Sequence, residues 1–328
     1  MVEIRLLGRF AVRRDGEEIP PTAFGGRMVR TLVRLLVSRR GTFVSHDAAV
    51  EALWSGRLPA DPVANLQVLV TRARRALGDP TLILTGAGGY SFVADGRCVV
   101  DAELFLAAVA AGRERSTEGQ AGAALRELGE ALERWPGEAL PEDAYEDWAQ
   151  EYRARLARAR LQALEEGAAA ALAVRDPIRA VALAEQAVRQ EPLRESARLL
   201  LARGLAASGN SVAALRALEA FRRQLADEVG LEPSAEARDL EQRILQGEPL
   251  GPAVRRPIVP PPPATFQELA FVGRDEELSA VLSVVSGPAP GAALVSGGPG
   301  AGKSRLLAEV ASRSTVPVLS ARAFLPEQ

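Results

Sequence analysis

The sequence predicts a mainly α-helical protein with a small β component: a winged helix-turn-helix, a tetratricopeptide-like helical bundle and a truncated α/β P-loop segment. Three patterns indicate this order. Short apolar strands and a glycine-rich hairpin enclose three helices in residues 1–97, and alanine-rich helices with a 34-residue period fill residues 98–246. A proline-rich linker over 247–265 then leads to a glycine-rich phosphate-binding motif in segment 266–328.

Strands and two helices open the first segment. Residues 2–12 mostly alternate apolar and polar, 15–16 (Asp-Gly) supplies a turn and 18–19 begins a return strand. This pattern predicts a small antiparallel sheet. A helix with an apolar face is expected over 28–37, and a second helix is expected over 45–54, where a serine can cap the first turn.

Residues 61–78 carry the most specific functional signal. Asp61 can cap a helix, Pro62 suits its first position and Gly78 supplies a stop, so both ends of a helix are encoded. One arc of this helix is apolar and is expected to face a core. Its members are Leu66, Leu69, Val70, Ala73 and Leu77.

The opposite face of this helix is polar and cationic and has no carboxylate. Arginine, asparagine and glutamine suit a helix that lies in a DNA major groove, where they read base edges and meet phosphates. An ordinary solvated basic face is the alternative interpretation. The face comprises Gln67, Val68, Thr71, Arg72 and Arg75, with Asn65 and Arg74 at its margins.

A hairpin follows this helix. Apolar stretches 82–85 and 90–93 flank the glycine-rich turn 86–89. A sheet, three helices and a hairpin in this order are typical of a winged helix-turn-helix, in which the third helix enters the major groove and the hairpin is the wing. Tyr90 could touch the minor groove or a phosphate, or it could pack at the hairpin base.

Composition limits the function. Cys98 is the only cysteine and His46 the only histidine, so an internal disulfide and metal sites of the Cys/His type are excluded. No run of about 18 apolar residues occurs, which predicts a cytoplasmic protein without a membrane partner. Residues 1–97 hold 14 arginines against 9 acidic residues, whereas 98–248 hold 19 against 27. This asymmetry is expected when one domain faces phosphate and its neighbour does not.

The alanine-rich helices contain an internal repeat. A string that starts at Ala180 recurs 34 residues later at Ala214, and each copy follows a turn. This is the tetratricopeptide period, which predicts stacked helix pairs that bind proteins. Aromatic residues nearby are expected in the core or at an interface: Trp135, Tyr145 and Trp148. An acidic cluster is expected to be a solvated helical surface and not a metal or acid-base site: Glu142, Asp143, Glu146, Asp147 and Glu151.

The last segment contains the sequence Gly-Gly-Pro-Gly-Ala-Gly-Lys-Ser over 297–304, between a strand expected over 292–296 and a helix expected over 305–311. It matches the P-loop pattern, whose backbone N–H groups surround phosphates. The chain ends 24 residues later without a Walker B carboxylate, so we expect no catalytic residue, and ATP with Mg²⁺ only in a complete ATPase domain. Nucleotide-binding candidates are Gly297, Gly300, Gly302, Lys303 (the only lysine) and Ser304, which could ligate Mg²⁺.

Several motifs resemble one family, the Streptomyces antibiotic regulatory proteins in their large form. Its OmpR-type winged helix is similar to Phe43-Val-Ser-His-Asp, Glu51-Ala-Leu-Trp, Asn65-Leu-Gln-Val-Leu-Val-Thr-Arg-Ala-Arg-Arg-Ala-Leu-Gly and Gly88-Gly-Tyr. Its bacterial transcriptional activation domain is similar to 101–246, including Phe221-Arg-Arg-Gln-Leu-Ala-Asp-Glu-Val-Gly-Leu-Glu-Pro-Ser, and its ATPase module to Phe271-Val-Gly-Arg with the P-loop. One departure is Phe24-Gly-Gly-Arg27, where the family commonly places a basic residue before the first long helix.

The resemblance implies a transcriptional activator that binds direct repeats of double-stranded promoter DNA near the −35 element as a side-by-side pair. It implies recruitment of RNA polymerase holoenzyme with its σ factor, often for secondary-metabolite genes, and no cofactor for DNA binding. Carried over by position, the DNA-facing residues are Asn65, Gln67, Thr71, Arg72, Arg74 and Arg75, with Tyr90 in the wing.

Two alternatives come from other classes. A signalling P-loop ATPase would use the helical bundle as a protein platform and the winged helix only for protein contacts. A tetratricopeptide-type scaffold would have no affinity for DNA. A footprint of residues 1–97 on DNA would separate the first interpretation from both.

Overall fold

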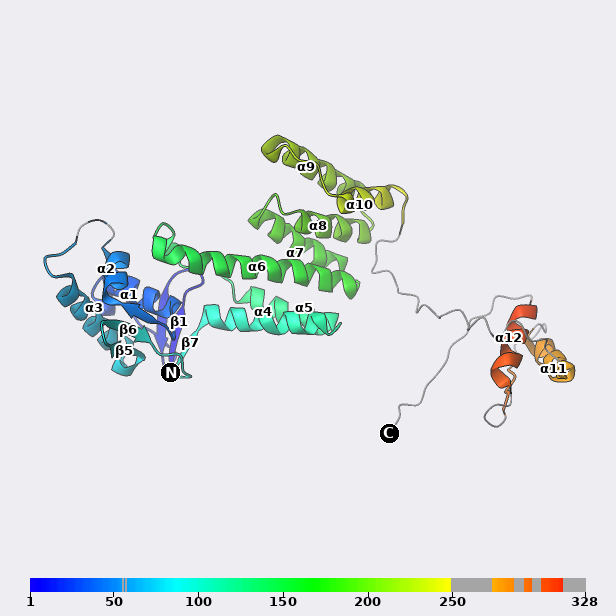
Figure 1. Ribbon diagram of the computed structural model, residues 1–328, viewed down its shortest axis with the longest axis horizontal. Coiled ribbons are helices and arrows are strands. Elements are labelled where there is room, and N and C mark those ends of the chain that lie inside the picture. Colours follow the sequence, from blue (N-terminus) through cyan, green and yellow to red (C-terminus); the bar gives the residue numbers. More distant parts are fainter. Residues whose placement is uncertain (55, 57, 249–272, 286–291, 297–301, 315–328) are drawn as a thin grey trace. The chain divides into compact units, whose positions relative to one another are not determined.

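The computed structural model describes residues 1–54, 56, 58–248, 273–285, 292–296 and 302–314. The chain divides into two compact units, Met1–Ala253 and Val254–Gln328 (Figure 1). Helices dominate the described residues of both units. All strands of the described residues lie between Val2 and Val100. The prediction of a mainly helical protein with a small β component is confirmed.

A four-stranded sheet starts the first unit. Its order is β3 (Glu17–Glu18), β2 (Ala11–Arg14), β1 (Val2–Arg5) and β7 (Cys98–Val100). The predicted antiparallel pairing is confirmed for β1 to β3, with Ile4 opposite Val12. The parallel pairing of β7 with β1 was not predicted, because it joins segments far apart in the sequence and leaves no local pattern.

Three helices and a second sheet complete the winged-helix part. The helices are α1 (Arg27–Ser38), α2 (His46–Leu53) and α3 (Pro62–Leu77), with 3₁₀ turns η1 (Pro21–Phe24) and η2 (Pro80–Leu82). The second sheet has the order β4 (Phe43–Ser45), β6 (Gly89–Phe92) and β5 (Ile83–Gly86). The predicted hairpin is therefore two strands of a three-stranded sheet, and β4, which is only three residues long, was missed.

Caps fix the helix boundaries as the sequence indicates. The Ser45 hydroxyl accepts a hydrogen bond from the Ala48 N–H at 3.1 Å, and the Asp61 carboxylate accepts one from the Ala64 N–H at 2.9 Å. Gly78 ends α3 in the left-handed region with φ 76°. The predicted starts of α2 and α3 are confirmed by these contacts.

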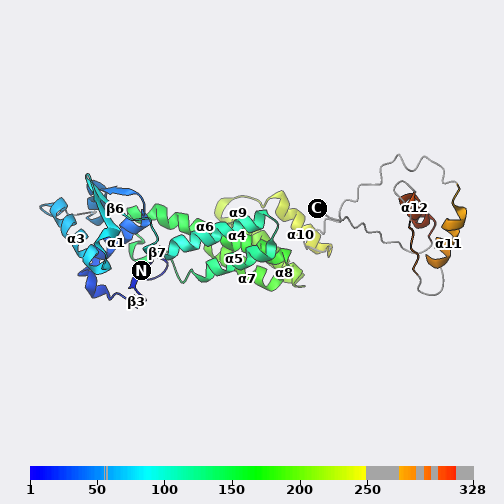
Figure 2. The same ribbon diagram turned by 90° about the horizontal axis from the view of Figure 1, so that it is seen from below.

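Seven helices of the described chain form the rest of the first unit, stacked one after another (Figures 1 and 2). They are α4 (Asp101–Thr117), α5 (Ala121–Glu133), α6 (Asp147–Ala173), α7 (Pro177–Gln190), α8 (Glu195–Ala207), α9 (Ser211–Val229) and α10 (Ala235–Leu245), with the 3₁₀ turn η3 (Pro141–Asp143) before α6. The 34-residue repeat is confirmed. Asp176 and Asn210 cap α7 and α9 in the same way, and Ala180 and Ala214 are both fully buried.

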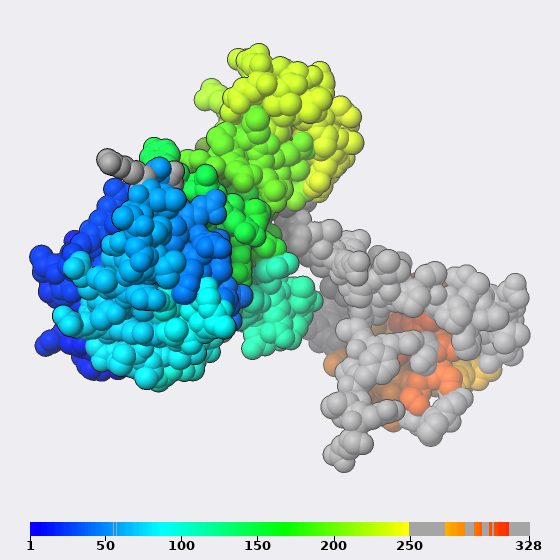
Figure 3. Space-filling model, turned by 60° about the vertical axis from the view of Figure 1, so that its left-hand side comes forward, coloured from blue at the N-terminus to red at the C-terminus, as the bar shows by residue number. Residues whose placement is uncertain are grey.

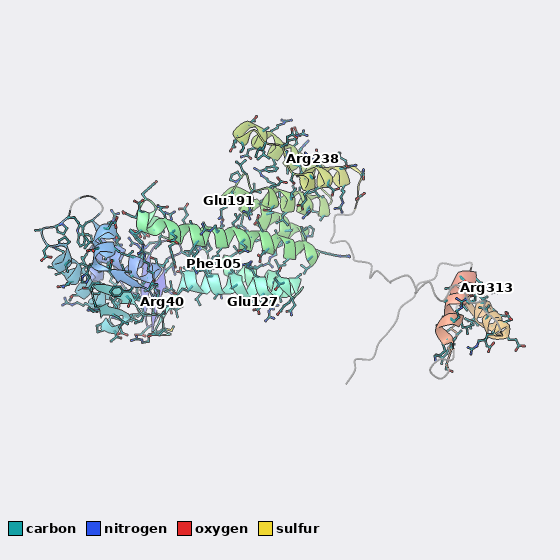
Figure 4. The ribbon with its side chains drawn as sticks, viewed as in Figure 1. Arg40, Phe105, Glu127, Glu191, Arg238 and Arg313 are labelled. Atoms are coloured by element: carbon teal, nitrogen blue, oxygen red, sulfur yellow. The ribbon has the colours of Figure 1, made fainter. Side chains whose placement is uncertain are left out.

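One hydrophobic core spans the winged-helix part and the first helices of the bundle. Leu6 of the N-terminal sheet and Phe105 of α4 belong to the same cluster of buried side chains. Phe105, labelled in Figure 4, is fully buried. Its ring meets that of Trp135 edge-on, with 4.9 Å between the centroids. The expected boundary between residues 97 and 98 therefore lies within a continuous core.

Buried polar contacts join the two parts of this unit. The Asp101 carboxylate accepts hydrogen bonds from the Leu6 and Leu7 N–H groups at 2.7 and 3.0 Å. The Arg34 guanidinium of α1 binds the Asp143 carboxylate of η3 through Nε and Nη2, with Nη2–Oδ1 at 2.8 Å. Both side chains are almost completely buried, at 2% and 0% exposure.

The acidic cluster is thus only partly the solvated surface that the sequence predicts. Asp143 is buried with Arg34, Glu142 accepts a hydrogen bond from the Phe10 N–H at 3.0 Å, and Glu146 lies 3.9 Å from the Arg27 guanidinium. The prediction is wrong for Asp143, which is buried because the winged-helix part supplies its partner from a distant position in the chain, and it holds only in part for the half-buried Glu146. It is confirmed for Glu142, Asp147 and Glu151, which are exposed.

Cys98 reports on the packing of β7, since its side chain is buried and burial raises the pKa of its thiol to about 11. Only the thiolate reacts with disulfide reagents. We therefore expect Cys98 to react with dithionitrobenzoate at pH 8 far more slowly in the native chain than in guanidinium chloride, as measured by absorbance. Equal rates would show that β7 does not pair stably with β1.

The second unit is described over α11 (Asp275–Val285), α12 (Lys303–Arg313) and residues 292–296. Leu278, Leu306 and Val310 form a small core. The strand expected over 292–296 is wrong, because these residues have no strand partner in the described part and a strand needs one. Phe271 and much of the P-loop lie outside the described residues. No helix in the described part of the chain is long and apolar enough to cross a bilayer.

Candidate nucleic-acid interface

Helix α3 presents one face to the core and one to solvent. All five residues predicted to face the core are buried: Leu66, Leu69, Val70, Ala73 and Leu77. Helices α1 and α2 pack against this side of α3. The predicted orientation of the helix is therefore confirmed.

The exposed face of α3 carries two cations without counter-ions. Arg72 and Arg75 are exposed, and neither has an ion pair or hydrogen bond to another described residue. Between them and the start of the helix lie Gln67, Val68 (49% exposed) and Thr71. Long unpaired arginines beside short polar and apolar side chains can contact phosphates and base edges.

Asn65 and Thr71 are exposed but bound within their own helix. The Asn65 amide donates to the Asp61 carbonyl at 2.8 Å, and the Thr71 hydroxyl donates to the Gln67 carbonyl at 2.9 Å. Each side chain keeps an oxygen that can accept a further hydrogen bond. Their place on the solvent face fits the prediction, and their contact with bases stays a prediction.

Arg74 joins α3 to the wing. It is half-buried, and its guanidinium donates to the Ile83 carbonyl at 3.0 Å from Nε and 2.6 Å from Nη2. Nη2 also donates to the Thr85 hydroxyl at 2.8 Å. These bonds attach α3 to β5 and position the wing relative to the helix, and the DNA contact of Arg74 stays a prediction.

The predicted wing contact by Tyr90 is wrong. The side chain is only 4% exposed, and its ring centroid lies 5.3 Å from that of His46. Packing at the hairpin base, the other interpretation of this residue, is what the structure shows. Tyr90 lies opposite Val44 where β6 pairs with β4, inside the second sheet.

The exposed wing tip consists of backbone and small side chains. Ala87 and Gly88 are exposed, and Gly88 has φ 83°, which favours glycine. Such a tip can approach a phosphate through its N–H groups without a long side chain. The predicted turn over 86–89 is confirmed, whereas the neighbouring Tyr90 is buried.

A further cation lies at the C-terminal end of α3 and was missed. A Cβ added to Gly78 would lie 2.0 Å from Nη1 of Arg14, so the Arg14 side chain crosses the helix end. Arg14 is exposed and lies in β2, 64 positions before Gly78. The negative end of the helix dipole favours a cation there. No local sequence signal could have brought these two residues together.

Carboxylates near this face are engaged elsewhere. Hydrogen bonds from Thr81 lower the pKa of Asp79, and its carboxylate lies 3.6 Å from the Arg97 guanidinium. Arg97 is also paired with Asp95 at 2.7 Å. Figure 3 shows the winged-helix part, coloured blue to cyan, as one continuous surface on this side of the molecule. The exposed face of α3 is therefore cationic and not neutralised by its neighbours.

The helical part matches a family model described as bacterial transcriptional activator domain over residues 100–245. Together with the winged-helix part, this match defines the class of the protein: a transcriptional regulator that joins a winged helix to an activator domain.

Known proteins identify the family. Transcriptional regulator RedD of Streptomyces coelicolor is 32% identical over 257 residues, which cover 76% of this chain and 72% of RedD. Regulatory protein AfsR of the same species is 33% identical over 333 residues, which cover 94% of this chain and 32% of AfsR. The chain belongs to the Streptomyces antibiotic regulatory protein family of transcriptional regulators. It spans about a third of the length of the AfsR proteins of two Streptomyces species, at 32% and 30%.

A solved structure supports the same architecture. The structure of Mycobacterium tuberculosis EmbR in complex with a low affinity phosphopeptide superposes with a TM-score of 0.69 at 26% identity. The superposition covers 76% of this chain and 66% of that chain.

Proposed function

We propose that this chain is a sequence-specific DNA-binding transcriptional activator whose helix α3 enters the major groove. The observation that carries the proposal is the pair Arg72 and Arg75, exposed and without a partner among the described residues, on a helix whose opposite face is fixed in the core. Such a helix can present base-reading side chains in one orientation. RedD, which this chain resembles over most of its length, is named a transcriptional regulator.

The proposed site consists of the exposed α3 face, the wing tip and Arg14. Gln67, Arg72 and Arg75 would read bases or phosphates, the wing tip and Arg14 would meet phosphates, and Arg74 would hold the wing in place. We propose that two copies bind direct repeats side by side near the −35 element. The family implies that the helical part then recruits RNA polymerase holoenzyme with its σ factor, at promoters of secondary-metabolite genes.

DNA binding by this site is proposed to need no cofactor. The contacts that shape it are side-chain and backbone hydrogen bonds within the first unit. The nucleotide-binding prediction concerns the second unit, where Gly302 is the N-cap of α12 and Lys303 is its first residue. Ser304 lies in the same helix, and Gly297 and Gly300 lie outside the described residues. ATP with Mg²⁺ is expected only in a protein with a complete ATPase domain.

A selection of random DNA duplexes by the purified chain tests the proposal. We expect recovery of a spaced direct repeat, because two copies in the same orientation would bind side by side. Affinity for that repeat should fall steeply with salt, since binding at phosphates releases counter-ions. The measurement is fluorescence anisotropy at increasing salt concentrations. Recovery of no enriched sequence, together with no footprint, would refute DNA recognition and favour a protein-binding scaffold.

A further inference from the structure

Tyr145 is the most exposed of the large hydrophobic side chains in the described bundle, and no described contact explains it. It is 98% exposed and lies in the short corner between η3 and α6. Tyrosine usually hides its ring and leaves only its hydroxyl in water. A fully solvated ring in an ordered segment is typical of an interface, where tyrosine is enriched among the residues that dominate binding energy.

The backbone that presents Tyr145 is held firmly on both sides. The Glu146 N–H donates to the Asp143 carbonyl at 3.1 Å, and Asp143 is anchored by the buried Arg34. The Gln150 amide donates to the Ala144 carbonyl at 2.8 Å. A ring displayed on such a corner loses little conformational freedom when a partner covers it, which favours binding.

The surroundings of Tyr145 are acidic. Asp147 and Glu151 lie four residues apart in the first turns of α6, are exposed, and have no ion pair within the described chain. Glu146 is half-buried, and its nearest cation is Arg27 at 3.9 Å. Unpaired carboxylates repel phosphates and attract cationic side chains. A tyrosine ring can also bind a cation over its face.

This corner lies beside the proposed DNA interface. Arg27, the neighbour of Glu146, begins α1, and a Cβ on Gly25 just before it would lie 3.9 Å from Cδ of Arg72. Figure 3 shows the green start of α6 at the surface next to the blue winged-helix part. A protein bound at this corner would therefore stand close to DNA that α3 contacts.

We propose that Tyr145 with Asp147 and Glu151, here called the Tyr145 site, docks a basic polypeptide segment of the RNA polymerase holoenzyme. This inference rests on the proposed function for the choice of partner. An arginine or lysine of that segment would lie on the Tyr145 ring and pair with the two carboxylates. Charge excludes DNA itself as the occupant.

The test measures binding of purified RNA polymerase holoenzyme to the immobilised chain by interferometry without DNA. We expect Tyr145→Ala and Asp147→Arg each to weaken this binding about tenfold, as loss of an interface anchor does. Affinity for the selected DNA repeat, measured by anisotropy, should change less than about twofold for variants outside the contact surface. Reconstituted transcription should lose activation to a similar extent as holoenzyme binding. Thermal unfolding followed by circular dichroism checks that both variants fold.

Matched controls lie on other helices of the same unit. Ile178→Ala removes an apolar side chain that is 78% exposed on α7, and Glu130→Arg reverses an exposed charge on α5. Neither should weaken holoenzyme binding. Failure of the holoenzyme to bind, or equal binding of all variants, would overturn the inference. So would a dimer in the centrifuge that Tyr145→Ala dissociates, because the occupant would then be a second copy.

The two proposals fail separately. If the chain selects a DNA repeat but its affinity for holoenzyme does not depend on Tyr145, docking at the Tyr145 site is wrong and DNA recognition stands. If no DNA is selected but holoenzyme binding still depends on Tyr145, docking at the Tyr145 site stands and the DNA proposal is wrong.

Discussion

Replacing Asp143 by alanine is expected to lower the free energy of unfolding by about 3 to 5 kcal/mol, because it leaves the buried Arg34 cation unpaired. Arg34 has few other partners to compensate. Its Nη2 donates to the Thr31 hydroxyl at 3.1 Å, and its guanidinium lies 5.1 Å from the centroid of the Phe10 ring. Urea denaturation followed by tryptophan fluorescence measures the loss, since Trp135 and Trp148 both pack against the shared core.

Glu151→Ala is the matched control for this prediction, because it removes an exposed carboxylate from the next helix and should change stability by less than about 0.5 kcal/mol. A double variant, Arg34→Met with Asp143→Leu, removes both charges and should be more stable than Asp143→Ala alone. A loss below about 1 kcal/mol for Asp143→Ala would contradict a buried, mutually dependent pair. Such a small loss would also argue against Arg34 and Asp143 as the anchor of the backbone that presents the Tyr145 site.

The joint between the two parts of the first unit has a consequence for activation. Asp101, Glu142 and Asp143 all bind groups of the winged-helix part, and β7 adds a strand to its sheet. These contacts and the shared core hold α3 and the start of α6 in one body. A surface on the bundle would therefore keep a fixed place relative to bound DNA. Flexible tethering would instead let the partner sample many positions.

Local interactions made much of this fold predictable. Ser45 and Asp61 cap helices within three residues of themselves, and Gly78 ends α3 through its own backbone conformation. The apolar residues of α3 recur every three or four positions, which places Leu66 and Leu77 on the core-facing side without reference to other parts of the chain. Patterns of this kind are visible in a short window of sequence.

Long-range contacts account for the errors. Tyr90 has the residue type of a DNA contact, but its ring is buried and packs near His46. Asp143 looks like part of an exposed acidic face, yet its partner Arg34 lies 109 positions earlier. Arg14 reaches the end of α3 from a strand 64 positions earlier in the chain. Pairings of this kind depend on tertiary structure, and no local spacing encodes them.

Removing both exposed cations of α3 is expected to weaken binding to the selected DNA repeat by roughly 2 to 6 kcal/mol, if each arginine contributes about 1 to 3 kcal/mol and the effects add. Neither Arg72 nor Arg75 has an ion pair among the described residues, so the double variant Arg72→Ala/Arg75→Ala should fold with unchanged stability. Fluorescence anisotropy at moderate salt measures the loss. Arg216→Ala, an exposed arginine on α9, is the control and should bind normally.

The single variant Arg75→Lys separates base reading from phosphate contact. Lysine keeps the charge but loses the planar fork that binds guanine with two hydrogen bonds. If Arg75 reads a base, Arg75→Lys should lose discrimination between the selected repeat and a mismatched one, with little change in the salt dependence. If it meets a phosphate, Arg75→Ala should instead reduce the salt slope by about one and weaken binding equally on all sequences. Unchanged affinity in the double variant would show that α3 does not enter the groove, because no other unpaired cations lie on its exposed face among the described residues.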